Sequence, residues 1–334
     1  MPEKRFLVVR LGSLGDIVHT FPAVAGLRQS FPWSEIVWLT HPRFVSLVES
    51  SGLASQIWPV DSRDLGSVRR VLAKIRSQAW DAAIDYQGLW KSSLLPFLGR
   101  VNVRIGFSTS TVREYGVPIL YTDRVVCRTQ HIADQNGELT LRAGASTAVG
   151  NVSLRVPSSD ETSVREQLTK DRAARYLVLS PGGGWRSKCW PAERYGELHH
   201  RLAERYRWRG IVSFGPGEQE LAQRVVEAAG KLAPVAIPLD LGPLMALLCR
   251  AKFVVSADSG PLHLASALGV PIVGLFGPTD PSRNGPYSSY DAVVRNPRFC
   301  ETTYRRGPSY SAGMLSITVE QVLDAVVERL GRGA

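Results

Sequence analysis

Short apolar runs alternate with segments of helical period, and this alternation limits the possible fold more than any other feature. In the first half, the expected strands are 6–9, 36–40, 57–60 and 82–85. The expected helices between them are 18–29, 43–51 and 65–77. Strands that alternate with helices form parallel sheets, because each helix returns the chain to the same edge of the sheet. The first half is therefore predicted to be an α/β, doubly wound, Rossmann-like domain.

The same alternation restarts after a stretch at about 143–165 that is rich in Gly, Ser, Thr, Asp and Pro. Within this stretch, 152–156 is a candidate strand. The later strands are expected at 176–180, 210–214, 253–256 and 272–276, and the later helices at 192–205, 218–229, 261–268 and 318–330. A chain of 334 residues also suits two domains of roughly 150 residues each. We place the domains at 1–155 and 156–317, followed by a C-terminal helical segment, 318–334.

Polar loops directly after the expected strands are the candidate ligand sites, because doubly wound sheets bind ligands at the carboxyl ends of their strands. The first is Arg10-Leu-Gly-Ser-Leu-Gly-Asp16. It is neither a G-x-G-x-x-G dinucleotide loop nor a P-loop. Asp16 has two interpretations. It is either a first-turn or N-cap residue that favours the helix dipole, or a carboxylate base at the lip of a cleft.

The second loop, Ser180 to Glu193, combines three consecutive glycines with two cations, Arg186 and Lys188. Exposed backbone N–H groups and positive charge suit a diphosphate. The alternative is a flexible turn with two solvated cations. A third loop, Gly215-Pro-Gly-Glu218, offers an acid that either caps the next helix or accepts hydrogen bonds from ribose hydroxyls.

A fourth site candidate combines the segment 256–265 with the segment 274–281. The N-terminus of the helix after Ser259-Gly260-Pro favours phosphate. His263 is either a satisfied structural residue or a ligand. A hydrolase triad built on Ser259 is not supported, because no G-x-S-x-G elbow precedes it. Asp258 and His263 lack a third local metal ligand, so no metal site is expected.

The charge pattern indicates an anionic partner. The chain carries a formal net charge of +10, and each half contributes +5 (17 Lys/Arg against 12 Asp/Glu, then 23 against 18). Such a balance suits an anionic substrate or membrane surface. Nucleic acid fits the charge equally well, but no nucleic-acid motif supports it. The cations of 63–76 suit a solvated helix face, whereas Lys91 and Arg113 stand in loops after strands.

The four cysteines include no C-x-x-C pair, so neither a disulfide framework nor a zinc site is expected, and a reducing compartment is the default. The N-terminal apolar run FLVV is too short for a signal peptide. No stretch approaches the roughly 20 apolar residues that span a bilayer. A cytoplasmic protein with peripheral membrane contact is expected.

Taken in order, these segments resemble glycosyltransferase family 9, the lipopolysaccharide heptosyltransferases. The resemblance rests on Arg10 to Ala23 with Leu27-Arg28 and Phe31-Pro32, Asp85 to Ser92, Trp185 to Pro191, Phe214 to Glu218, Asp258 to His263 and Gly277 to Asp280. It covers most of the chain. His19-Thr20 and the Lys91 loop look nearest to the heptosyltransferase I branch.

The resemblance implies a GT-B fold, with two Rossmann-like domains facing across a cleft and a final helix packing back towards the N-terminal domain. It implies an ADP-L-glycero-β-D-manno-heptose donor and a Kdo-lipid A acceptor at the anionic inner leaflet of the cytoplasmic membrane. Asp16 and Lys188 match catalytic positions. The matched or expected donor-binding residues are Gly183, Gly184, Lys188, Glu218 (or its neighbour Gln219), Asp258, Ser259, Gly260, His263 and Thr279. The expected acceptor-binding residues are Ser13, Arg63, Lys91 and Arg113.

One departure stands beside the resemblance. Relatives of the heptosyltransferase I branch commonly carry Thr-Thr where this chain has Gly183-Gly184. Backbone N–H groups would have to replace two hydroxyl donors.

The expected chemistry is inverting glycosyl transfer with neither cofactor nor metal, since no Asp-x-Asp motif of the metal-dependent kind is present. The alternative is a GT-B transferase or epimerase that uses another nucleotide sugar for a different surface glycan.

Overall fold

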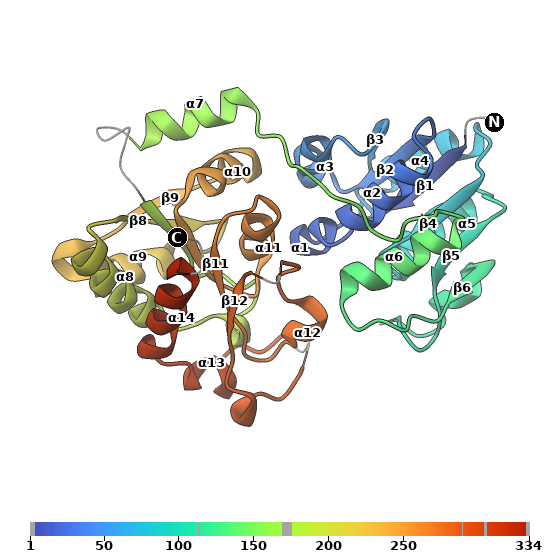
Figure 1. Ribbon diagram of the computed structural model, residues 1–334. Helices are drawn as coiled ribbons and strands as arrows, with labels where there is room; N and C mark the ends of the chain where they lie inside the picture. The colour runs from blue at the N-terminus through green and yellow to red at the C-terminus, as the bar shows by residue number, and fades with distance from the viewer. Residues whose placement is uncertain (1–3, 113, 169–175, 289, 304–305, 332–334) are drawn as a thin grey trace. The chain divides into compact units, whose positions relative to one another are not determined.

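The structure is a computed structural model that describes residues 4–112, 114–168, 176–288, 290–303 and 306–331 (Figure 1). The chain divides into two compact units, Met1–Arg155 and Val156–Ala334. Each unit has its own parallel six-stranded sheet. Within the described residues, no helix is both long and apolar enough to cross a bilayer.

The first unit is built on strands β1 (Arg5–Val9), β2 (Glu35–Thr40), β3 (Gln56–Pro59), β4 (Ala82–Asp85), β5 (Arg104–Phe107) and β6 (Asp123–Val125). Its helices are α1 (Leu14–Val18), α2 (Phe21–Ser30), α3 (Val45–Ser51), α4 (Leu65–Arg76), α5 (Trp90–Leu98) and α6 (Ile132–Arg142), with short 3-10 turns η1 (Pro42–Phe44) and η2 (Val117–Leu120). The strand order β3-β2-β1-β4-β5-β6 is that of a doubly wound sheet.

Both faces of this sheet are buried, as a parallel sheet requires. On one face, Leu7 and Val9 of β1 pack with Val71 and Ile75 of α4 and Leu95 of α5. The other face is covered by α2 and α6, which lie against each other. Successive residues from Phe6 to Val9 are therefore buried on opposite faces, which explains why all four are apolar.

The helix expected over 18–29 is interrupted in the structure. The chain forms α1 first, and α2 begins only at Phe21. Pro22 lies at the start of α2 and has no N–H to donate to the preceding turn, so one continuous helix is excluded. Side chains take over the carbonyls at the break. Thr20 Oγ1 donates to Asp16 O at 2.8 Å, and Asn136 Nδ2 donates to His19 O at 3.1 Å.

The second unit repeats the plan. Its strands are β7 (Tyr176–Ser180), β8 (Arg209–Phe214), β9 (Val235–Pro238), β10 (Phe253–Ala257), β11 (Ile272–Leu275) and β12 (Ala292–Val294). Its helices are α7 (Ser158–Gln167), α8 (Ala192–Tyr206), α9 (Gln219–Ala228), α10 (Leu241–Arg250), α11 (Gly260–Ala267), α12 (Pro281–Asn284), α13 (Ala312–Ser316) and α14 (Val319–Gly331). The 3-10 turns are η3 (Arg186–Lys188), η4 (Gly230–Leu232) and η5 (Pro297–Phe299). The strand order β12-β11-β10-β7-β8-β9 has the same winding as the first sheet.

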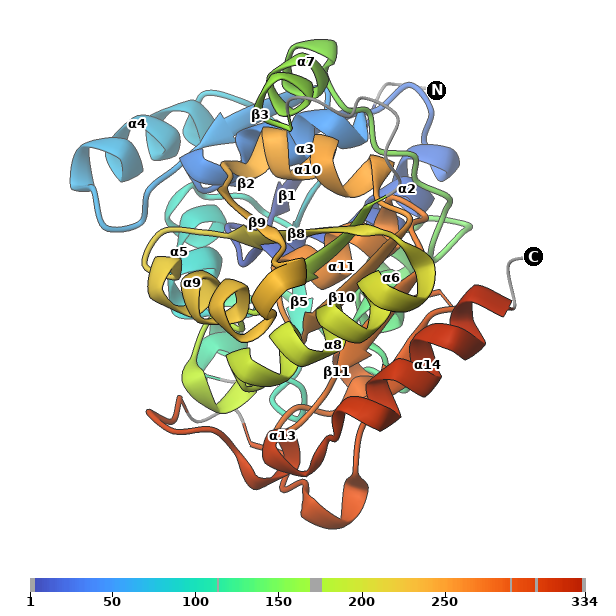
Figure 2. The same ribbon diagram turned by 90° about the vertical axis from the view of Figure 1, so that its left-hand side faces the viewer.

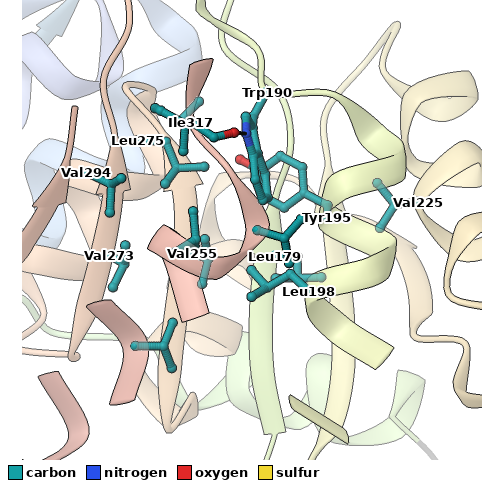
Figure 3. Packing of buried hydrophobic residues seen from close by; sticks show 14 of the residues in the cluster. Leu179, Trp190, Tyr195, Leu198, Val225, Val255, Val273, Leu275, Val294 and Ile317 are labelled. Carbon is teal, nitrogen blue, oxygen red and sulfur yellow. Dashed lines mark hydrogen bonds between the residues drawn. The ribbon is translucent and has the colours of Figure 1, made fainter. Parts of the chain in front are cut away.

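Helices α9, α8 and α14 lie side by side on one face of the second sheet, and α10 lies between α7 and α11 in the other layer (Figure 2). Trp190 anchors the core beneath α8 (Figure 3). It packs edge-on against Tyr195, and its Nε1 donates to Ile317 O at 3.0 Å, just before α14. The start of α8 is therefore fixed to the start of α14.

The C-terminal helix belongs to the core of its own unit. Val319, Val322 and Val326 of α14 are buried in the same cluster as Leu275 of β11. The apolar face that the sequence indicates is therefore used within the second unit. The expected packing of this helix towards the N-terminal domain stays a prediction.

The stretch around the unit boundary differs from its expected structure. Residues 152–156 form no strand, although Arg155 N donates to Ser50 O at 2.8 Å. Beyond Pro157 the chain forms α7, in a stretch for which no helix was predicted. Pro157 stands at the N-cap, and Asp160 and Glu161 in the first turn favour the helix dipole. The composition of this stretch is typical of a linker, but its acidic residues here form the first turn of a helix.

Each sheet has one switch point, where the strand order reverses, and ligands of doubly wound folds bind there. In the first unit it lies between β1 and β4, so the loops 10–13 and 86–89 flank it. In the second unit it lies between β7 and β10, so the loop 181–185 and the turn at 258–259 flank it. The predicted loops at 10–16, 85–92, 180–193 and 256–265 thus flank the switch points, whereas 215–218 and 277–280 follow neighbouring strands.

Candidate active site

Asp16 is the third residue of α1, and its carboxylate has partners on both oxygens. Oδ2 accepts hydrogen bonds from the Ser13 backbone N–H at 3.1 Å and from Ser13 Oγ at 3.0 Å. Oδ1 lies 2.8 Å from Arg10 Nη2. The Asp16 side chain is still 36% exposed, whereas that of Arg10 is 5% exposed. Asp16 is a first-turn residue, as one interpretation has it, and it also remains open to a ligand.

Arg10 joins the two loops at the first switch point. Its guanidinium donates to the Tyr86 carbonyl as well as pairing with Asp16. Beside it, the Leu11 N–H donates to Gln87 Oε1 at 2.8 Å. The sequence places Arg10 in the first candidate loop but predicts no role for it. The signal in the sequence that could have indicated a role is a charged residue directly after the apolar run of the first strand.

Asp85 shapes the loop that leads to Lys91. Its buried carboxylate accepts hydrogen bonds from Tyr121 Oη at 2.7 Å, Ser92 Oγ at 2.9 Å and the Gln87 N–H at 2.9 Å. Burial raises the pKa of Asp85, and these hydrogen bonds oppose that rise. The network ties the end of β4 to the first turn of α5. The second residue of that helix is Lys91.

The predicted acceptor residues are spread over this edge of the first sheet. Ser13 is exposed before α1, and Lys91 is exposed at the start of α5. Arg63 is exposed in the turn after β3, where its N–H donates to Asp61 Oδ1 at 2.9 Å. Arg113 lies outside the described residues. The structure joins Ser13 to Asp16, and the roles of all four in acceptor binding stay predictions.

In the second unit, Glu218 reaches across to the glycine loop after β7. A Cβ atom at Gly182 would lie 2.0 Å from Glu218 Oε1, so any larger residue there would displace this carboxylate. Glu218 stands at the N-cap of α9 but makes no side-chain cap there, and its Oε2 accepts from the Gly215 N–H at 3.0 Å. Glu218 therefore joins two strand-end loops, which a helix cap would not do.

The rest of the glycine loop follows the Lys188 backbone closely. A Cβ atom at Gly183 would lie 3.0 Å from Lys188 Cβ. Gly184 has a φ of +78°, a left-handed conformation that side chains disfavour. Gly183 and Gly184 therefore permit a tight turn immediately before η3.

Lys188, Asp258 and His263 form a buried charged cluster at the second switch point. Lys188 Nζ lies 2.6 Å from Asp258 Oδ2, and His263 Nε2 lies 3.0 Å from Asp258 Oδ1. The three side chains are 11%, 6% and 6% exposed. Burial opposes the negative charge of Asp258, but the His263 hydrogen bond and the Lys188 charge outweigh it and hold the pKa of Asp258 well below its usual range.

This cluster can present positive charge to an anion. An ammonium group has three donors, so Lys188 can bind Asp258 and still donate to a phosphate oxygen. Ser259 is the N-cap of α11, and Gly260 is its first residue. The first N–H groups of a helix have no acceptor within it and favour phosphate. The Ser259 hydroxyl is held by Ser256 Oγ at 2.9 Å.

Thr279 lies in the loop after β11, in the same unit. It is 1% exposed, and its Oγ1 has no hydrogen-bond partner among the residues that the structure describes. A buried hydroxyl without a partner is unusual in folded proteins. The same described residues contain no group of three His, Cys, Asp or Glu side chains placed to hold a metal ion.

Comparisons with known proteins show the family of this chain. Residues 68–312 match the model of glycosyltransferase family 9 (heptosyltransferase). Lipopolysaccharide heptosyltransferase 1 of Pseudomonas aeruginosa is 31% identical over 305 residues, which cover 85% of this chain and 81% of that protein.

Solved structures extend the likeness to the fold. The Escherichia coli ADP-heptose lipopolysaccharide heptosyltransferase II has a TM-score of 0.82 at 20% identity, over 98% of this chain and 99% of the other. An Escherichia coli heptosyltransferase solved with ADP has a TM-score of 0.75 at 25% identity, over 98% of each chain. The predicted GT-B class of two doubly wound domains is confirmed. With most of its length matched by the family model, the chain belongs to glycosyltransferase family 9, the heptosyltransferases.

Proposed function

We propose that this enzyme transfers heptose from ADP-L-glycero-β-D-manno-heptose to the Kdo region of the lipopolysaccharide inner core, with inversion at the anomeric carbon. The observation that carries the proposal is the buried Lys188–Asp258–His263 cluster beside the glycine loop at a switch point. The heptosyltransferase 1 relative and the related heptosyltransferase solved with ADP support the same donor.

In the proposed reaction, Asp16 removes the proton of the acceptor hydroxyl. The acceptor oxygen attacks the anomeric carbon, and the bond from that carbon to the diphosphate oxygen breaks on the opposite side. ADP leaves with the bonding electron pair. The ion pair with Arg10 stabilises the ionised form of Asp16 that a base requires, and the bond to Ser13 fixes its orientation.

Negative charge builds on the diphosphate as it leaves. Lys188, the N–H groups at the start of α11 and those of the glycine loop are the groups proposed to stabilise it. We propose that they make a metal ion unnecessary. Turnover is therefore expected to persist in excess EDTA after exhaustive dialysis. Loss of activity that Mg²⁺ restores would contradict this part of the proposal.

The acceptor is proposed to be the Kdo-lipid A region, held by Ser13, Arg63, Lys91 and Arg113. Its acidic sugars and phosphates suit cations on exposed loops. The membrane surface that carries this acceptor is anionic, so we further propose peripheral contact with the inner leaflet of the cytoplasmic membrane. Both assignments rest on the positive charge of Arg63, Lys91 and Arg113 and on the exposure of Arg63 and Lys91.

A donor panel tests the proposal. The protein would be incubated with ADP-heptose, ADP-glucose, UDP-glucose or GDP-mannose, each with heptose-free Kdo-lipid A, and released nucleotide would be quantified. We expect ADP release from ADP-heptose alone, dependent on the acceptor. Release from another donor would show changed sugar specificity, and conversion of a donor without acceptor would indicate an epimerase.

Asp16→Asn is expected to lower kcat by about 100- to 10,000-fold, the usual contribution of a positioned base. The matched control is Glu320→Gln, because Glu320 is also a first-turn acid paired with an arginine, at 2.9 Å from Arg201. Wild-type turnover by Asp16→Asn would remove the base assignment. A similar loss in Glu320→Gln would point to general damage from breaking such a pair.

A further inference from the structure

Trp185 is a half-buried aromatic residue that the proposed mechanism does not use. It stands at the N-cap of η3, directly after the glycine loop, and Lys188 is the last residue of this turn. Residues three apart in a 3-10 turn have eclipsed side chains. The Lys188 N–H donates to Trp185 O at 3.1 Å, which closes the turn. The three-residue spacing therefore brings the indole ring next to the lysine side chain.

The face of the Trp185 ring lies against the Lys188 ammonium. Lys188 Nζ is 4.6 Å from the centre of the ring. The same ammonium pairs with Asp258 Oδ2 at 2.6 Å, and the Lys188 side chain is 11% exposed. A cation is attracted to the negative face of an aromatic ring, most strongly to tryptophan and where water is scarce. Within the described residues, Lys188 is thus held by a carboxylate and by an indole face.

These two groups act differently on the positive charge of Lys188. Asp258 takes up an N–H donor and brings a full negative charge. The indole face attracts the ammonium but carries no net charge. Because an ammonium has three donors, Lys188 can be fixed in this way and still donate to a phosphate oxygen. A second carboxylate in the place of the ring would instead repel an approaching anion.

Contacts with its faces hold the Trp185 ring in place. Its Nε1 is buried and has no hydrogen-bond partner among the described residues, although a buried tryptophan N–H usually finds one. The Arg306 guanidinium lies 5.6 Å from the centre of the ring. A second stack joins the same two segments, since the Arg186 guanidinium lies 4.1 Å from the centre of the Tyr310 ring. The chain after η5 therefore supports the ring that contacts Lys188.

We propose that Trp185 is a positioning residue, whose ring holds the Lys188 ammonium where it can stabilise the leaving diphosphate. This deepens the proposed function and rests on its assignment of Lys188. Trp185 itself is given no contact with the donor or the acceptor. Without the ring, the ammonium keeps its pair with Asp258 but loses the contact that fixes its direction. A smaller fraction of the enzyme then has the ammonium in the productive position.

Removing the ring while keeping the lysine tests the proposal. Trp185→Leu is expected to lower kcat about 5- to 30-fold, which corresponds to about 1–2 kcal/mol for one partly desolvated cation–π contact. Trp185→Phe keeps an aromatic face and should recover most of the loss. The control is Trp208→Leu, because Trp208 is also a half-buried tryptophan of the second unit and stacks on Tyr206. Equal kcat values for Trp185→Leu and this control would contradict the proposal.

Repeating the substitution without the ion pair distinguishes positioning from a general effect on the fold. Lys188→Met with Asp258→Leu removes both charges and fills their place with apolar side chains. In this background, Trp185→Leu should change kcat and the Kd for ADP by less than about twofold, because there is no ammonium to hold. A loss as large as in the wild-type background would show that the ring acts independently of Lys188, and the proposal would be wrong.

An NMR measurement tests the contact without turnover. Protons over the face of an indole ring resonate upfield, so the ε-CH2 signal of Lys188 in protein labelled with 13C-lysine should be shifted upfield. The signal is assigned by its absence from the Lys188→Met/Asp258→Leu variant. The upfield shift should vanish in Trp185→Leu and persist in Trp208→Leu. An unshifted Lys188 signal in the wild type would overturn the positioning role.

ADP binding keeps failure of this inference separate from failure of the proposed function. If no sugar is transferred in the donor panel, calorimetry with ADP still compares the same variants. Trp185→Leu should weaken ADP binding in the wild-type background and leave it nearly unchanged once Lys188 and Asp258 are replaced. An unchanged Kd for ADP in both backgrounds, in a protein without transfer activity, would reject the positioning role as well.

Discussion

Lys188 has a structural task and a proposed chemical task, and both arise from its burial. Its ammonium compensates the Asp258 carboxylate at 2.6 Å in a site that water scarcely reaches. Lys188→Ala would leave that carboxylate buried and hydrogen-bonded to His263. Breaking a buried pair in this way costs about 3–5 kcal/mol of unfolding free energy. Losing a charge-stabilising donor also lowers kcat by about 100- to 1000-fold.

A double variant separates these two effects. Lys188→Met with Asp258→Leu removes both charges, and such replacements often regain stability. We expect denaturant unfolding to show recovered stability, while kcat stays at the level of the single variant. Lys252→Ala, which changes an exposed lysine directly before β10, is the control for loss of a lysine. Recovery of kcat in the double variant would mean that Lys188 acts only by supporting the fold.

His199 makes the stability of the second unit depend on pH. It is 2% exposed in α8, and burial, with a smaller contribution from His200, lowers its pKa to about 4. In the unfolded chain its pKa is about 6.5. Between these values the unfolded state binds a proton that the folded state does not, so stability falls as the pH falls. The loss approaches about 3 kcal/mol near pH 4.

Urea unfolding of wild type and His199→Gln between pH 7.5 and 4.5 measures this effect. The difference in unfolding free energy between them should shrink steadily below pH 6.5, because only the wild type carries this penalty. His200→Gln is the control, since the His200 side chain is 40% exposed and pairs with Glu204. A difference that stays constant across this range would show that folding leaves the pKa of His199 unchanged.

At the scale of elements, the loop between β4 and α5 depends on one buried acid. Tyr121 Oη donates to Asp85 Oδ2 at 2.7 Å. Tyr121→Phe removes this donor while Asp85 stays buried, so we expect a loss of about 1.5–3 kcal/mol in unfolding free energy. A loosened loop should also raise the KM for the acceptor through Lys91, with kcat nearly unchanged. Tyr115→Phe, at 91% exposure, should leave both quantities at wild-type values.

The sequence predicts strands and helices correctly where the local residue pattern determines them. The strands at 82–85 and 176–180 are found as predicted, because each is a short apolar run with a clear end. The segment 152–156 reads equally well as a strand, yet it finds no neighbouring strand and stays irregular. The split between α1 and α2 is also missed by the pattern. The apolar period continues through Pro22 and predicts one helix, but this proline interrupts it.

The candidate sites show the same distinction between features that the local sequence determines and features that depend on the folded structure. Loops rich in glycine and charge are visible in the sequence, and the strand order brings them to the switch points. The pairing of Asp16 with Arg10, or of Lys188 with Asp258, depends on side-chain directions that the loops settle only when folded.

At the scale of the whole molecule, positively charged side chains are spread over both units, and several of them are clustered on α4. Its exposed side chains include Arg69, Arg70, Lys74 and Arg76, and its buried face packs on the first sheet through Val71 and Ile75. A helix that is apolar on one side and cationic on the other presents its charge to solvent. Each such cation near an anionic membrane contributes about 1 kcal/mol of attraction.

We therefore expect Arg69→Glu/Arg70→Glu to weaken sedimentation with phosphatidylglycerol vesicles at least about 10-fold, and binding to neutral vesicles to be weak throughout. Arg205→Glu/Lys231→Glu makes the same net-charge change on exposed residues of the second unit and should have a smaller effect. Salt should weaken wild-type binding, because charges are screened beyond about 10 Å at 0.1 M and about 3 Å at 1 M. Equal losses in both double variants would mean that net charge alone attracts the protein, whereas binding that resists 1 M salt would point to apolar insertion and not to α4.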